Sequence, residues 1–134
     1  MPPESQEDPE IAGFDGLLPF DPERFGILSE LGEEGDGEIL KEIVQQFLDD
    51  IEPLLGRMER AWLARDFAKL ADGAHTVKGG ASQFGLLRAE EAARRLENGA
   101  KAGEEEVSGR WFLEMKGALQ EGMGPLKRAA GIGV

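Results

Sequence analysis

The chain contains no cysteine and only one histidine, His75, and both scarcities narrow the chemistry open to it. Without cysteine there are no disulfides, no thiolate metal ligands and no thiol nucleophile. A single histidine makes a metal site built from several imidazoles improbable, although one imidazole can itself be a nucleophile. No apolar run approaches the roughly 20 residues that a membrane-spanning helix needs. We therefore expect a protein with no metal site of its own and no membrane span.

The charge is unevenly distributed along the chain. Residues 1–52 hold 16 acidic and 2 basic side chains, whereas residues 53–134 hold 11 acidic and 13 basic ones. Nucleic-acid binding requires a basic surface that neutralises phosphates, so nucleic acid is not an expected partner. The acidic, proline-containing start lacks the basic and apolar parts of a signal peptide, which favours a cytoplasmic protein. We interpret residues 1–20 as a disordered acidic tail and residues 21–130 as one folded domain.

Within that domain, apolar residues recur at steps of three and four, which is the spacing of amphipathic helices. The pattern predicts helices over residues 21–31, 38–66, 67–84, 86–103 and 104–130. No segment alternates with period two, so no strand is predicted. Short loops between consecutive long helices favour antiparallel neighbours. The expected fold is therefore all-α, an antiparallel up-and-down four-helix bundle with a short accessory N-terminal helix.

The histidine lies in the stretch AHTVKGGASQFG, residues 74–85, inside the expected 67–84 helix. Helical spacing puts His75 on a more polar face than the buried stripe, with Lys78 and Gly79 one turn later and Ser82 two turns later. Each glycine costs a helix roughly 1 kcal/mol relative to alanine, so the adjacent pair needs a reason. Gly79 removes a side chain beside the histidine, and Gly80 falls near the core line, where close helix packing is the expected reason.

A neutral imidazole nitrogen is a good nucleophile, and a nearby ammonium group can pair with the oxygens of a phosphoryl group. His75, Lys78 and Gly79 therefore suit a surface histidine that exchanges phosphate with a docked partner. The alternative is an ordinary solvated histidine next to glycines that only mark a packing contact or a kink. A nucleotide-binding loop is excluded, because the lysine precedes the glycines and no strand comes before them.

At these residues the sequence resembles the histidine-containing phosphotransfer (HPt) domain family. That family's motif is a histidine followed by a hydrophobic residue, Lys-Gly and two small residues, with a further glycine ten positions after the histidine. The positions that match are His75, Val77, Lys78, Gly79, Gly80, Ala81 and Gly85. The likeness extends over roughly residues 24–125 and includes a Leu-Glu pair near the end of the 86–103 helix. Gly80 departs slightly from the pattern, since serine or alanine is commoner there.

The resemblance implies that His75 is phosphorylated, on Nε2, and exchanges the group with an aspartate of a response-regulator receiver domain. It implies that Lys78 assists the phosphoryl group and that Gly79 permits close approach of the partner. The expected partners are receiver domains and a hybrid sensor histidine kinase, with Mg²⁺ supplied by the receiver and no cofactor in this chain. Further candidates for the docking surface are Ser82 and Gln83, followed by Arg88, Arg94 and Arg95.

Two other interpretations remain open from the sequence. The same face could belong to a helical module that binds or sequesters a receiver or kinase without being phosphorylated. The chain could also be a segment of a larger sensor kinase, although its start methionine and acidic tail favour a stand-alone protein. Kinase activity of its own is not expected, because there is no ATP-binding motif. We expect the carrier to work as a monomer.

Overall fold

The structure of the protein is a computed structural model that describes residues 13–32 and 37–133, apart from the side chains of residues 29, 31 and 32. A single helical turn at residues 13–15 precedes five helices. These are α2 (Pro22–Gly32), α3 (Glu38–Leu63), α4 (Phe67–Phe84), α5 (Leu87–Lys101) and α6 (Glu105–Ala130). The described residues form no strand, and none of their helices is long and apolar enough to cross a membrane. The all-α prediction is confirmed.

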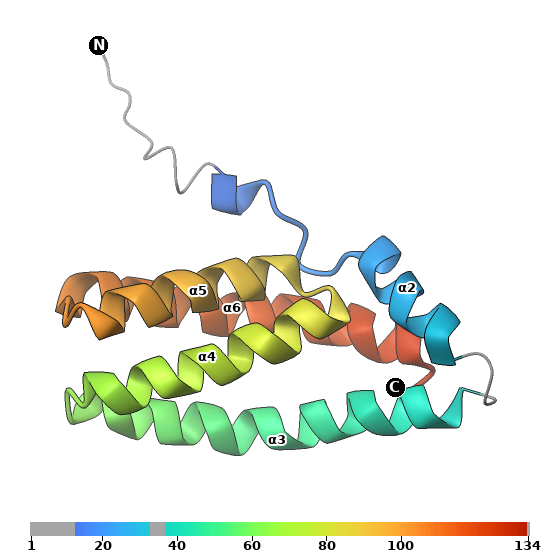
Figure 1. Cartoon of the computed structure of the whole chain (residues 1–134), viewed down its shortest axis with the longest axis horizontal. Helices are drawn as coiled ribbons and strands as arrows, with labels where there is room; N and C mark the ends of the chain where they lie inside the picture. Colours follow the sequence, from blue (N-terminus) through green and yellow to red (C-terminus); the bar gives the residue numbers. More distant parts are fainter. Residues whose placement is uncertain (1–12, 33–36, 134) are drawn as a thin grey trace, which may run out of the picture.

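The four long helices form the bundle, and the chain reverses direction at each short connection between them (Figure 1). Helices α3 and α5 each contact both α4 and α6, which closes the bundle around one core. The accessory helix α2 contacts α3 and α4 at the end where α3 begins (Figure 1). Residues of α4 and α5 that face the same side of this bundle are therefore neighbours in space.

The ends of α4 are fixed by two local signals that the sequence predicts correctly. The Asp66 carboxylate accepts a hydrogen bond from the Lys69 N–H at 3.2 Å, which caps the first turn. Gly85 ends the helix with φ of 78°, a left-handed conformation that favours glycine. Pro53 lies inside α3 without ending it, as the unbroken apolar stripe predicts. The histidine helix therefore has the expected length and phase.

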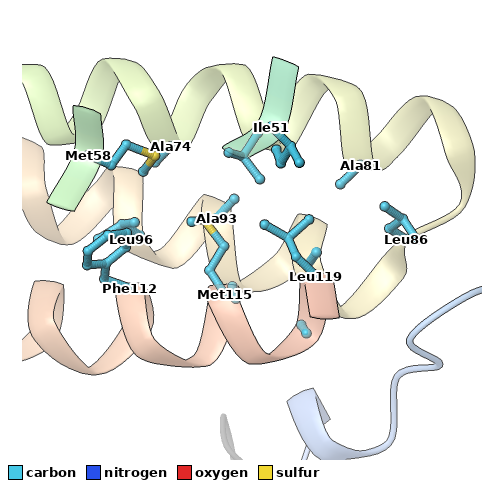
Figure 2. Packing of buried hydrophobic residues seen from close by; sticks show 14 of the residues in the cluster. Ile51, Met58, Ala74, Ala81, Leu86, Ala93, Leu96, Phe112, Met115 and Leu119 are labelled. Carbon is cyan, nitrogen blue, oxygen red and sulfur yellow. The ribbon is translucent and has the colours of Figure 1, made fainter. Parts of the chain in front are cut away.

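The core is large on its outer helices and small between α4 and α5 (Figure 2). Ile51 and Met58 of α3 and Phe112 of α6 supply large side chains. Alanines occupy the buried line where α4 meets α5, and the fully buried ones include Ala74, Ala81, Ala89 and Ala93. Alanine lets two helix backbones approach closely, because its side chain ends at Cβ. This close approach brings the histidine of α4 within reach of side chains on α5.

The prediction of a disordered tail over residues 1–20 is wrong for residues 13–20, whereas residues 1–12 lie outside the described part of the chain. Phe14 is 3% exposed, and its ring meets the Trp111 ring edge-on at 5.2 Å. The Arg88 guanidinium donates a hydrogen bond to the Asp15 carbonyl at 2.8 Å. The acidic and proline-rich composition obscured three apolar side chains, Phe14, Leu17 and Phe20, which pack on the bundle.

Candidate functional site

His75 lies near the middle of α4, on the side turned away from the core. Its side chain is 68% exposed, whereas Ala74 and Val77 on the same helix are fully buried. This placement agrees with the helical phase expected from the sequence. One edge of the imidazole faces the protein: Nδ1 lies 3.1 Å from the Glu97 carboxylate oxygen Oε2 on α5. The ring is therefore held at one nitrogen while most of the side chain is open to solvent.

Glu97 is a carboxylate in a buried position, with its side chain only 6% exposed. Three donors surround it: His75 through Nδ1, Lys78 through Nζ at 2.8 Å, and Lys101 through Nζ at 3.0 Å. A buried charge is costly unless it is paired and hydrogen-bonded, and these partners meet that requirement. Glu97 thus links α4 to α5 directly beneath the histidine.

The hydrogen bond from Lys78 is the main reason that the pKa of Glu97 is lowered from 4.5 to about 2, against the raising effect of its burial. Glu97 is therefore ionised at neutral pH and can only accept hydrogen bonds. Since the carboxylate has no proton to donate, Nδ1 of His75 must be the donor in their contact. In the neutral imidazole this assigns the free lone pair to Nε2, the nitrogen that does not contact Glu97.

The histidine is surrounded by more positive than negative charge. Glu97 contributes one negative charge, whereas Lys78 and Lys101 contribute two positive ones. Lys78 is 32% exposed and Lys101 is 65% exposed, so both ammonium groups are accessible from the surface. This local excess contrasts with the net charge of −12 over the whole chain. The site therefore favours an anion in a molecule that otherwise repels anions.

The two adjacent glycines of α4 face different environments. A Cβ added at Gly79 would have nothing within 4 Å, whereas one at Gly80 would lie 2.6 Å from the Phe47 ring of α3. Phe47 in turn packs against Phe84, with ring centroids 5.2 Å apart. Gly80 is thus needed for close packing between α3 and α4, in agreement with its expected place near the core line. Gly79 has no packing partner and leaves the surface beside His75 low.

Ser82 and Gln83 continue the same helix beyond Gly79. Gln83 is exposed, and Ser82 is partly buried where α2 meets α4. The Arg24 guanidinium of α2 donates a hydrogen bond to the Ser82 carbonyl at 3.0 Å. Ser82 follows His75 by seven residues, which corresponds to about 10 Å along a helix. A partner large enough to cover His75 and Gly79 would reach Gln83 and this edge of α2.

The three arginines of α5 are less uniform than the sequence suggests. Arg88 pairs with Glu121 of α6 at 3.0 Å, and the Arg95 guanidinium lies 4.6 Å from the centroid of the Trp111 ring. Both arginines therefore serve the contact between α5 and α6, which does not support their interpretation as docking residues. Arg94 is half exposed, binds Glu91, and lies one turn before Glu97. Of the three, it alone lies near the histidine face.

Sequence reasoning gave Glu97 and Lys101 no functional role. A signal for Glu97 was present, because this glutamate lies one turn from Ala93 on the apolar stripe of its helix, where a charge needs a partner. Lys101 follows it at i+4, a spacing that allows an ion pair. The sequence does not show which helix lies opposite, so the contact with His75 could not be foreseen.

The assembled site offers a nucleophilic nitrogen, a carboxylate that fixes the ring, and two cations beside a cleared surface. Within residues 13–32 and 37–133 no group of three or more histidine or acidic side chains is arranged to hold a metal ion. The acid-base and nucleophilic chemistry available to this chain is therefore that of one imidazole and its immediate partners.

The sequence model of the Hpt domain matches residues 42–123, a span that includes α4, α5 and most of α3 and α6. No curated protein and no solved structure gave a significant match. Because the matched span is more than half of the chain, the protein belongs to the Hpt domain family, the histidine phosphotransfer domains of two-component signalling. Proteins of this family carry phosphoryl groups to and from receiver domains and are not autonomous kinases.

Proposed function

We propose that this Hpt domain protein is a phosphorelay intermediate that accepts a phosphoryl group on Nε2 of His75 from a receiver-domain aspartate and passes it to a second receiver. A hybrid sensor kinase is the expected origin of the phosphate. The Mg²⁺ needed for the transfer belongs to the receiver. The direction of net transfer depends on the relative stability of the phosphorylated partners.

The transfer step follows from the hydrogen bonds of the imidazole. The Nε2 lone pair attacks the phosphorus of the aspartyl phosphate, an N–P bond forms, and the P–O bond to the aspartate breaks. The aspartate leaves as a carboxylate. Nδ1 keeps its proton, so the imidazole acquires positive charge, which the adjacent Glu97 carboxylate stabilises. Transfer to the next receiver reverses these steps.

One observation carries the proposal: the buried Glu97 carboxylate holds Nδ1 of His75 at 3.1 Å while the side chain stays 68% exposed. An ordinary solvated histidine would have no need of a buried, ionised partner that fixes its tautomer. The open space at Gly79 supports the same interpretation, because a receiver must bring its acidic pocket close to the imidazole. Lys78 supports it as well, since its ammonium group lies on the same carboxylate.

The test is phosphotransfer profiling with a panel of labelled, phosphorylated receiver domains. At least one receiver should label the wild-type protein, and the label should be acid-labile and base-stable. The variant His75→Gln should accept no label, because the chain has no second histidine. Circular dichroism checks that the helix content of this variant is unchanged, as expected for a mostly exposed side chain.

Label that survives in His75→Gln would refute the assignment of the acceptor. Receiver binding without any transfer to the wild-type protein would instead favour the binding-module alternative. The variant Lys127→Gln is the matched control, since it changes one polar residue near the end of α6. It should be labelled like the wild type.

A further inference from the structure

We propose that Lys101 of α5 is a second cation of the phosphorylated site, which leaves Glu97 and binds the phosphoryl oxygens once His75 is modified. The inference rests on the proposed function. It concerns a lysine outside the histidine helix, 26 positions along the chain from His75. It also explains why two lysines, rather than one, surround a single carboxylate.

The position of Lys101 relative to the histidine follows from their common partner. His75 Nδ1 and Lys101 Nζ both contact the same oxygen of Glu97, Oε2, at 3.1 and 3.0 Å. Lys78 contacts the other oxygen, Oε1, at 2.8 Å. Lys101 is therefore the lysine on the imidazole's side of the carboxylate, and it approaches from α5 while Lys78 approaches from α4.

The two ion pairs of Glu97 are held unequally. Lys78 has the shorter contact and is 32% exposed, whereas Lys101 is 65% exposed. An ion pair with a largely solvated lysine contributes little to stability and is exchanged easily. Lys101 can thus turn away from Glu97 at small cost, while Lys78 stays on the carboxylate and keeps it ionised beneath Nδ1.

Phosphorylation changes the charge that the site must hold. Before the transfer, two lysines face one carboxylate. Afterwards, a phosphoryl group adds up to two negative charges and several strong acceptor oxygens. With Lys78 kept on Glu97, the new charge has only Lys101 as a cation that the site can release to it. A charge-assisted hydrogen bond from this ammonium group stabilises the phosphorylated state relative to the free one.

The experiment uses a receiver that labels the wild-type protein and measures the equilibrium ratio of phosphorylated carrier to phosphorylated receiver. Lys101→Met should lower this ratio by about threefold to tenfold, the range of one exposed charge-assisted contact. Lys101→Arg should restore most of it, because the charge returns. Lys116→Met is the matched control, since Lys116 also pairs with a glutamate, Glu59 at 3.1 Å. That variant should leave the ratio within about twofold of the wild type.

The forward and reverse rates separate this role from a merely structural one. If Lys101 only oriented Glu97 and the imidazole, Lys101→Met would slow both directions alike and leave the ratio unchanged, which would overturn the inference. An equal loss in Lys116→Met would also overturn it, since the effect would then be one of overall charge. Failure of every receiver to label the wild-type protein refutes the proposed function itself, a result distinct from either of these.

Discussion

Helix α5 carries two glutamates that each bind two cations, and they behave differently. Glu91 binds Arg94 and Arg95, both on its own helix at i+3 and i+4, and its side chain is 23% exposed. Glu97 binds Lys101 on its own helix but also residues of α4, and its side chain is 6% exposed. The pKa of each carboxyl is lowered, for Glu91 mainly by the Arg94 hydrogen bond and for Glu97 mainly by that from Lys78.

The difference lies in what each network holds in place. The ion pairs of Glu91 join neighbouring turns of one helix, and such local pairs stabilise a helix by only a few tenths of a kcal/mol. Glu97 joins two helices and fixes the orientation of an exposed imidazole. The same residue type, with similar charge around it, is therefore structural on one face of α5 and positions a nucleophile on the other.

The largest test of this comparison is the pair of variants Glu97→Gln and Glu91→Gln. Glutamine at 97 can present its amide N–H to Nδ1, which moves the imidazole proton to Nε2 and removes the attacking lone pair. We expect the rate of His75 phosphorylation to fall by about tenfold to a hundredfold, the range known for carboxylates that orient a functional histidine. Glu91→Gln should change the rate by less than about twofold.

The measurement for this pair is single-turnover transfer from one phosphorylated receiver, with circular dichroism as the check on folding. Equal rates for the two variants would show that Glu97 does not orient the imidazole. A loss of helical signal in Glu97→Gln would move the comparison to Glu97→Asp, which keeps the charge but shortens the reach to Nδ1.

A second, smaller test is the stability of the protein in acid. The folded-state pKa of Glu97 is about 2, below the ordinary value of 4.5 that applies when the chain is unfolded. A depressed pKa contributes stability that is complete above about pH 5 and is lost as the pH falls towards 2. The contribution is on the order of 2 kcal/mol. Urea unfolding should show that the stability advantage of the wild type over Glu97→Gln shrinks from pH 6 to pH 3, and a constant difference would contradict this.

The smallest expected effects come from the adjacent glycines of α4, which divide in the same way between surface and packing. Gly79→Ala should stabilise the protein by roughly 0.5–1 kcal/mol, because alanine favours the helix and its Cβ meets nothing. Gly80→Ala should destabilise it by about 1 kcal/mol, because the clash with Phe47 outweighs the same helical gain. Urea denaturation midpoints measure both, and changes of the same sign would remove the distinction.

Much of the fold could be predicted because its signals are local. The apolar stripes, the Asp66 cap and the glycine at 85 are each set by neighbours within a few residues, and the helices begin and end close to the expected positions. The choice between Phe112 and Leu113 as the buried residue of α6 stayed open, since both suit the spacing. The structure buries Phe112 and leaves Leu113 67% exposed.

The candidate site was predictable only in part. Helical phase exposes His75 beside Lys78 and Gly79, and the motif resemblance points to the same residues. The role of Arg88 could not be foreseen, because its partners belong to α6 and to the segment before α2. The packing of Phe14 was missed for a similar reason, since its burial depends on Trp111 almost one hundred positions away.

The sequence by itself determined an all-α protein with one exposed histidine, because helical periodicity and capping act over three or four residues. Only the tertiary structure decided which nitrogen of that histidine is free. The small side chains between α4 and α5 bring Glu97 beneath Nδ1, and its burial among three donors keeps it ionised. A contact between residues 22 positions apart depends on how two helices pack, and this packing turns a surface histidine into an oriented nucleophile.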